Sequence, residues 1–159
     1  MKKSLIASIK TGAKAGVSAG LAGVLAMFFV ACGDDASKVY NTWNLVSLSN
    51  NGANIDISKT QKEAFVTIDK EKFNGNAGCN SFFGSHKIIN NQIQSSNTGM
   101  MRMLCDPESM AVEDTLIKLF SDSAVDFRLE NDSLVLQKKG DEGSEGIKAV
   151  FKEKDKGVK

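Results

Sequence analysis

The sequence predicts a mainly β (α+β) domain, a small antiparallel β-barrel-like fold with one α-helix. Three observations support this prediction. From residue 41 onward, apolar residues alternate with polar ones in short runs, as in strands with one buried face. Turns rich in asparagine and glycine separate these runs. Apolar residues follow a helical spacing in one segment, residues 107–121. Many short strands with mostly short connections favour a compact barrel.

Residues 1–31 are expected to be a lipoprotein signal peptide. A start with four lysines and no acidic residue leads into an apolar run, Val17 to Ala31, which is short and glycine-rich for a transmembrane helix. The run ends in a sequence that resembles a bacterial lipobox, so we expect lipidation of Cys32. The alternatives are an ordinary cleaved signal with an incidental cysteine, and an uncleaved anchor.

Residues 32–38 are expected to form a short lipid-anchored tether, which reaches only about 20 Å when fully extended. The residue after the cysteine is Gly33 rather than Asp. By resemblance to enteric lipoproteins, this favours the cell envelope's outer membrane, on its periplasmic face. The expected attachment to the membrane is through the N-terminal lipid alone.

Charge excludes one class of partner. The chain of 159 residues has a formal net charge of +1. Without the four leader lysines, 16 basic residues remain against 19 acidic ones. A weakly acidic domain has no electrostatic footprint for nucleic acid and no strong attraction to an anionic membrane surface.

The first half of the domain is predicted to consist of strands and tight turns. Trp43 and Leu45 alternate with polar residues in the first strand, and Asn90-Asn91 suits a tight hairpin because asparagine tolerates a positive φ. Glycines at 75, 78 and 84 indicate a bulge, a barrel corner or a close backbone approach. The predicted strands are 41–48, a brief one around Ile55 and Ile57, 65–68, 73–77, 85–89 and 92–95.

The second half is predicted to begin with the helix. Asp106 is a preferred N-cap, Pro107 suits the first helical position, and Glu108 places a favourable charge in the first turn. A hairpin over residues 125–136 follows, with its turn at Asn131-Asp132. After a polar loop, a last strand contains Ile147, Ala149 and Phe151.

Several of these residues resemble the META/HslJ family of small bacterial envelope lipoproteins. The domain expected from this resemblance spans 39–152, and 153–159 is expected to be a flexible tail. The resemblance implies a mixed β-barrel with one helix and a link to heat shock or envelope stress, but no reaction. Met101-Arg102-Met103 departs slightly from the family's spacing. The resemblance rests on Trp43-x-Leu45, Phe73-x-Gly75-x-x-Gly78-Cys79-Asn80, Phe83-Gly84, Thr98-x-Met100 to Met103-x-Cys105, Glu113 with Leu116 and Ile117, and Leu134-x-Leu136.

Cys79 and Cys105 are expected to form a disulfide. They are the two cysteines that remain after lipidation, and export would bring them into an oxidising compartment. A disulfide here would stabilise the domain by about 3–4 kcal/mol in the chain-entropy model. The alternative is two separate buried thiols.

Neither catalysis nor metal binding is expected. His86, the sole histidine, is predicted to lie on the surface and far from Cys79, and no common catalytic motif is present. Met100, Met101, Met103 and Cys105 could supply soft ligands for Cu(I), but in a strand Met100 would point away from the other three. Methionine more often fills gaps in a core.

Glu113 lies beside the apolar stripe of the predicted helix, where an unpaired charge would be costly. Arg102 or a backbone N–H of the cysteine segment could be its partner. A site carboxylate is the functional interpretation, and a structural role is favoured. Gly75, Gly78, Asn80, Gly84 and Glu113 are therefore interpreted as a structural motif.

The favoured function is a non-enzymatic, lipid-anchored envelope domain that binds an unidentified envelope protein in stress tolerance, without a cofactor. It predicts a barrel filled by the helix face and by five aromatic residues. The alternatives are a small-ligand or metal-binding barrel with an interior cavity of several hundred Å³, and a thiol–disulfide redox module, which lacks a Cys-x-x-Cys motif. The five aromatic residues are Trp43, Phe65, Phe73, Phe127 and Phe151.

Overall fold

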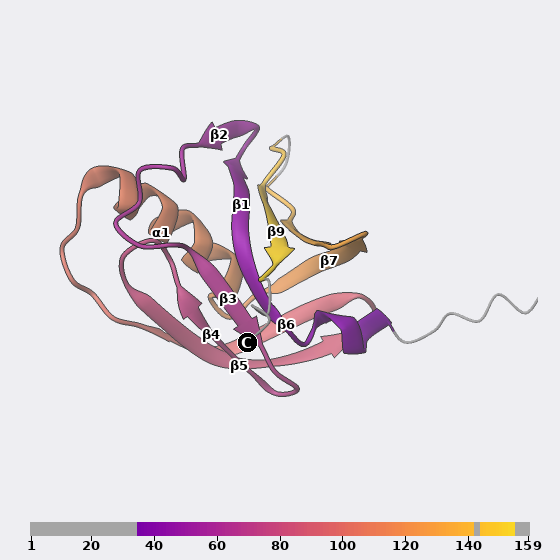
Figure 1. The fold of residues 1–159 in the computed structure, drawn as a ribbon. Coiled ribbons are helices and arrows are strands. Elements are labelled where there is room, and N and C mark those ends of the chain that lie inside the picture. Colours follow the sequence, from indigo (N-terminus) through magenta and orange to yellow (C-terminus); the bar gives the residue numbers. More distant parts are fainter. Residues whose placement is uncertain (1–34, 142–143, 155–159) are drawn as a thin grey trace, which may run out of the picture. The chain divides into compact units, whose positions relative to one another are not determined.

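A computed structural model describes residues 35–141 and 144–154 of the chain (Figure 1). The expected signal peptide and the expected lipidation site, Cys32, lie outside these residues, as does the end of the predicted tail. No helix in the described part is long and apolar enough to cross a membrane. The elements are η1 (Asp35–Val39), β1 (Thr42–Asn50), β2 (Ala53–Ile55), β3 (Phe65–Ile68), β4 (Lys72–Asn76), β5 (Ser81–Ile89), β6 (Gln92–Met100), α1 (Pro107–Phe120), β7 (Ala124–Glu130), β8 (Ser133–Lys138) and β9 (Ile147–Glu153).

The strands form a closed antiparallel barrel. Their order is β1-β3-β4-β5-β6-β7-β8-β9, and β9 pairs with β1 to close the sheet. The short β2 pairs with β1 outside this ring. All pairings are antiparallel, and the described residues contain one α-helix. The predicted fold class is confirmed.

Tight turns with left-handed residues connect the hairpins. Asn90 and Asn91 have φ values of 50° and 60°, which lets β5 turn directly into β6. Asn131, with a φ of 54°, makes the equivalent turn between β7 and β8. Asparagine tolerates this backbone conformation better than most residues. Both hairpin predictions are confirmed, although β5 and β6 are longer than the sequence predicted.

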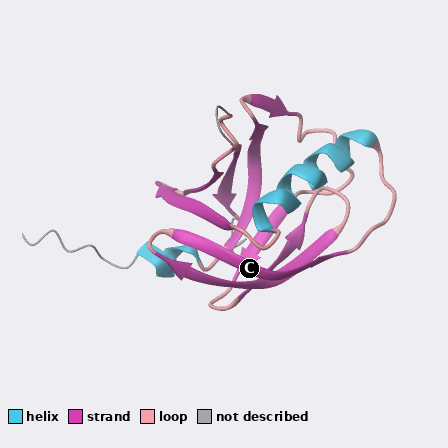
Figure 2. Ribbon diagram, turned by 180° about the vertical axis from the view of Figure 1, so that it is seen from behind, coloured by secondary structure: helices cyan, strands magenta, loops and turns pink. Residues whose placement is uncertain are grey.

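The helix begins at its predicted cap. The carboxylate of Asp106 accepts hydrogen bonds from the backbone N–H of Ser109 (2.7 Å) and from its hydroxyl (2.9 Å). The helix lies against the barrel strands (Figure 2), and Val112, Leu116 and Leu119 are buried on its inner face. A capped helix with one apolar face thus supplies part of the core.

Aromatic residues fill the core, with one exception to the expected set. Trp43, Phe73, Phe127 and Phe151 are buried as expected. Phe65 is only half-buried, with the Lys154 Nζ 5.4 Å from the centre of its ring. The alternation in β3 turns Val66 and Ile68 inward and therefore turns Phe65 outward.

Phe82 and Phe120 complete the aromatic core instead. Their ring centres lie 5.3 Å apart, and Phe73 lies 5.1 Å from Phe120. These tilted contacts lie in the range favoured by aromatic pairs. The β4–β5 side of the barrel is thereby joined to the end of α1.

A short helix lies at the start of the described residues. Asp35–Val39 forms a 3-10 helix where a tether was expected through residue 38. Val39 is fully buried, and the indole N–H of Trp43 donates to its carbonyl oxygen at 2.8 Å. Burial of one apolar residue and one hydrogen bond therefore hold this segment to the barrel. At the other end, β9 includes Glu153, which was expected to begin the tail.

Candidate functional site

The two cysteine segments meet beside the start of α1. Cys79 and Cys105 form a disulfide, with their Cα atoms 6.5 Å apart, within the usual range for such bonds. Cys79 is buried between β4 and β5, and Cys105 directly precedes the cap residue Asp106. The disulfide thus joins the β4–β5 connection to the beginning of the helix.

The β4–β5 connection is a turn held by its own side chains. Gly78 has a φ of +97°, which L residues rarely adopt. The side chain of Asn76 accepts a hydrogen bond from the Gly78 N–H (3.0 Å) and donates one to the Cys79 carbonyl oxygen (3.2 Å). A Cβ atom at Gly78 would also lie 2.8 Å from Thr60 Cγ2. Both backbone conformation and space therefore require glycine here.

Asn80 holds three segments together. Its side chain is buried and forms two hydrogen bonds of 2.9 Å with the backbone of Met103, donating to the carbonyl and accepting from the N–H. Its own backbone N–H donates to Glu113 Oε2 on α1 at 3.2 Å. One asparagine therefore joins the β4–β5 connection to the loop before the helix and to the helix itself.

Glu113 is buried, and its partner is one of the two that the sequence suggested. The carboxylate accepts from a backbone N–H of the cysteine segment, that of Asn80. A hydrogen-bonded carboxylate at this place connects the helix to the turn, which fits a structural role.

Gly75 and Gly84 are sites where the backbone closely approaches other groups. A Cβ atom at Gly75 would lie 2.1 Å from the Phe65 carbonyl oxygen. One at Gly84 would lie 2.4 Å from the ring of Phe73, its cross-strand partner. The buried Phe73 ring therefore covers a position that has to be glycine.

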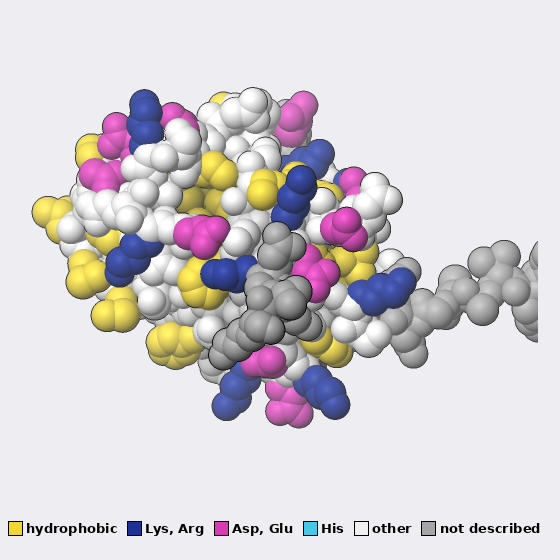
Figure 3. All heavy atoms as spheres, in the orientation of Figure 1, with side chains coloured by type: hydrophobic (Ala, Val, Ile, Leu, Met, Phe, Trp, Pro, Cys, Tyr) yellow, Lys and Arg dark blue, Asp and Glu magenta, His cyan; other side chains and the backbone are white. Residues whose placement is uncertain are grey.

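Residues 101–106 form no strand, so the strand geometry considered for Met101, Met103 and Cys105 does not apply. Met101, Met103 and Leu104 are exposed, with Leu104 96% exposed. We call these three residues the apolar loop. Figure 3 shows hydrophobic side chains gathered along the margin where Figure 1 draws this loop.

The sulfur-containing residues do not converge on a copper site. Met100 packs against the core, whereas Met101 and Met103 face solvent. The sulfur of Cys105 is bonded to that of Cys79. Across residues 35–141 and 144–154, no group of three or more His, Cys, Asp or Glu side chains is placed to hold a metal ion.

His86 is the residue whose predicted position differs most from the one in the structure. It was expected on the surface, but only 3% of it is exposed. Its ring lies between Tyr40 and Phe73, 6.5 Å and 6.3 Å from their ring centres. A signal was available, because His86 has the same parity in its strand as the buried Phe82 and therefore points inward.

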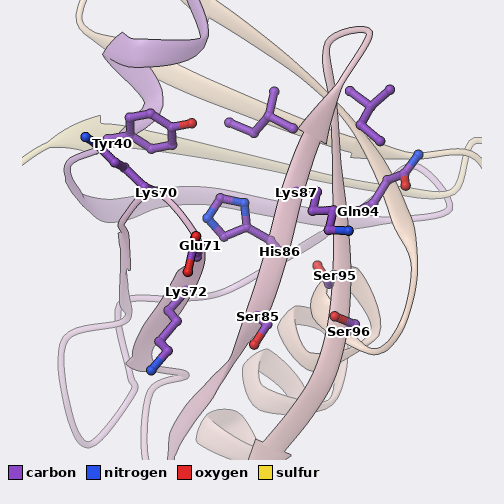
Figure 4. A pocket seen from close by; sticks show the side chains of 12 residues that line it. Tyr40, Lys70, Glu71, Lys72, Ser85, His86, Lys87, Gln94, Ser95 and Ser96 are labelled. Carbon is purple, nitrogen blue, oxygen red and sulfur yellow. The ribbon is translucent and has the colours of Figure 1, made fainter.

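A pocket opens beside His86 (Figure 4). Its volume is about 900 Å³, and its lining comes from Tyr40, the β3–β4 turn, the start of β4, β5 and β6. Ser95, which lies opposite His86 in the β5–β6 ladder, is part of the lining and was not singled out from the sequence. No sequence pattern indicates this pocket, because the pocket depends on which strands become neighbours.

Comparisons with known proteins agree with this architecture. Two structures solved by NMR share the fold. One is a protein from Burkholderia xenovorans, with a TM-score of 0.58 and 16% identity over 76% of this chain and 87% of that one. The other has a TM-score of 0.53 and 19% identity over 71% of this chain and 88% of that one. No curated protein matches the chain. The profile of the META domain matches residues 37–152, so the chain belongs to the META domain family.

Proposed function

We propose that this protein is a non-enzymatic, lipid-anchored envelope protein whose META domain contributes to stress tolerance by binding another envelope protein through the apolar loop. The observation that carries the proposal is that this loop is both exposed and firmly held. Asn80 fixes the backbone of Met103, and the disulfide fixes the end of the loop at Cys105.

Exposed apolar side chains contribute little to the core of the domain, but a partner protein can bury them. Burying one such side chain against a partner contributes about 1.5–3 kcal/mol. A loop that is already ordered loses little conformational entropy when it binds. Phe83, which is 58% exposed on β5, adds a further exposed apolar side chain to this domain.

The location of the loop favours a protein partner over the anchoring membrane. The chain enters the domain at η1, and Figures 1 and 2 both draw η1 and the loop before α1 on opposite sides of the barrel. If Cys32 carries the lipid, the apolar loop would face away from the membrane surface that holds the protein. Its occupant would then be a protein with a complementary apolar groove.

The alternatives from the sequence have less support. Large side chains occupy the barrel interior where a ligand-binding barrel would have its cavity, with Trp43, Phe73 and Phe151 among them. A redox module needs an accessible sulfur for exchange, but Cys79 is buried. Catalysis by Cys79 with His86 would need a free thiol, and this sulfur is in a disulfide.

The anchor is tested separately from the binding surface. Wild-type and Cys32→Ala chains are expressed in cells fed with radiolabelled palmitate, and inner and outer membranes are separated. We expect label in the wild-type outer-membrane fraction and none in the variant. Equal labelling of the two chains, or a soluble wild-type protein, would contradict the anchor.

The binding surface is tested by photo-cross-linking in living cells. A photoreactive amino acid replaces Leu104 in one strain and Asp132, an exposed residue of the β7–β8 turn, in the control strain. We expect a discrete cross-linked protein at position 104 only, and its loss when Met101 and Met103 are both changed to Asp. The same pattern at both positions, or persistence in the double variant, would contradict the proposal.

A further inference from the structure

Two residues that line the pocket beside His86 each carry a buried polar atom that no group in the described residues satisfies. The Nδ1 atom of His86 and the hydroxyl of Ser95 are both buried without a hydrogen-bond partner. The two residues are 3% and 8% exposed, and they face each other directly across the β5–β6 ladder. Buried polar groups are almost always paired, so two neighbouring exceptions in a pocket indicate a place prepared for a ligand.

The other ring nitrogen of His86 determines what this ligand has to offer. Nε2 lies 2.7 Å from the carbonyl oxygen of Asp69. A carbonyl oxygen only accepts hydrogen bonds, so Nε2 carries the hydrogen. In the neutral imidazole, Nδ1 is then an acceptor. The ligand group that pairs with His86 is therefore a donor, such as a hydroxyl.

Ser95 can serve the same ligand hydroxyl or its neighbour, because a serine hydroxyl both donates and accepts. Tyr40 adds an aromatic ring to the lining, beside His86. An aromatic ring next to polar groups suits the apolar face of a sugar ring, whose edges carry hydroxyls.

The charges around the pocket favour an anion. Lys70, Lys72 and Lys87 line it, against one acidic side chain, Glu71 (Figure 4). The domain as a whole is weakly acidic, so three lysines around one pocket are a local feature. Lysine ammonium groups attract phosphate or carboxylate without imposing a fixed geometry.

We propose that this pocket binds an anionic sugar, with a hydroxyl that donates to His86 Nδ1 and an acidic group that pairs with a lysine of the lining. This site goes beyond the proposed function, because it involves other residues than the apolar loop. Loss of either activity would leave the other intact.

The test is NMR titration of the full chain with three probes: glucose 6-phosphate, glucose and inorganic phosphate. We expect saturable shifts at Tyr40, His86 and Ser95 with glucose 6-phosphate, and at least about tenfold weaker binding of the other two probes. Long-range ¹⁵N spectra of the imidazole should show hydrogen on Nε2 in the free protein and a shift of Nδ1 on binding. No saturation by about 10 mM, or equal binding of inorganic phosphate, would overturn the proposal.

Variants separate the site from general effects on folding. His86→Phe keeps a buried ring but removes the acceptor, and it should weaken glucose 6-phosphate binding at least about tenfold. Lys87→Gln changes an exposed side chain and should weaken it while leaving the fold unchanged. Lys148→Gln, on β9 and outside the pocket lining, is the matched control. Equal affinities for the Lys87 and Lys148 variants would contradict the role of the pocket lysines.

Discussion

The side-chain amide of Asn80 pairs with the backbone of Met103 in both directions, through two hydrogen bonds of 2.9 Å each. The amide thus satisfies both backbone hydrogen-bonding groups of Met103, as a neighbouring strand would in a sheet. Residues 101–106 form no strand, so this pairing holds the middle of the loop. Asn80 therefore orders the apolar loop together with the disulfide and the hydrogen bond from the Met101 N–H to the Ser81 carbonyl oxygen (3.0 Å).

Replacing Asn80 with Ala should destabilise the domain. The change removes the buried amide of Asn80 and leaves the part-buried N–H and carbonyl of Met103 without their partner, and such losses cost about 1–3 kcal/mol. Urea unfolding measures the change in free energy of unfolding. The matched control is Asn74→Ala, an exposed asparagine on β4, which should change it by less than about 0.5 kcal/mol. Equal effects of the two changes would contradict the role of Asn80.

Removing the disulfide should lower the free energy of unfolding by more than the Asn80→Ala change does. The cysteines are 26 positions apart in the sequence, for which the chain-entropy model gives about 3.5 kcal/mol. Urea unfolding of the Cys79→Ala, Cys105→Ala double variant, compared with the oxidised chain, measures this loss. Alkylation of the mature protein without prior reduction checks whether the native protein contains the disulfide. Label on both cysteines of the native protein would show that the disulfide is absent in the cell.

Two glycines that face aromatic rings should respond differently to alanine. Gly84 faces Phe73, which is buried and cannot move, so Gly84→Ala should cost about 1–3 kcal/mol through overpacking. Gly99 faces Phe83, whose ring is mostly exposed and can turn away. Gly99→Ala should therefore change the free energy of unfolding by less than about 0.5 kcal/mol. A larger loss at Gly99 than at Gly84, in parallel thermal or urea unfolding, would contradict this ordering.

The cap of α1 should make stability depend on acid pH. The hydrogen bond from the Ser109 backbone N–H favours the charged carboxylate and lowers the pKa of Asp106 below its ordinary value of 3.8. The carboxyl group of Asp106 therefore holds its proton less tightly in the folded state than in the unfolded state. This contribution to stability is present above pH 3.8 and is lost as the pH falls through the lower folded pKa.

Asp106→Asn keeps a capping side chain but cannot titrate. The difference between the urea midpoints of the wild type and this variant should therefore shrink as the pH falls below 3.8. A difference that stays constant from about pH 7 to about pH 2 would show that the cap carboxylate does not contribute in this way.

Local signals in the sequence were sufficient for most of the fold. The Asn90-Asn91 turn, the Asp106-Pro107 helix start and the alternation in β7 and β8 each depend on residues close together in the chain. They gave the right hairpins, the helix and the fold class. Closure of the barrel by β1 and β9 brings together residues about a hundred positions apart, and no local pattern specifies it.

The errors occurred where the environment of a residue depends on its neighbours in space. Phe65 was placed in the core because it is aromatic, but the parity of β3 turns it outward. His86 was placed outside because it is polar, but the parity of β5 turns it inward. For Glu113, the sequence left two candidate partners, Arg102 and a backbone N–H of the cysteine segment. The choice between them needs the folded chain, which places the Asn80 N–H beside the helix.

The central claim is that the cysteine segments form a scaffold that holds the apolar loop in one conformation. Backbone ¹⁵N relaxation of the full oxidised chain tests it most directly. We predict order parameters of about 0.85 for Met101, Met103 and Leu104, falling below about 0.6 in the Asn80→Ala variant. Order parameters already below about 0.6 in the wild type would contradict the claim.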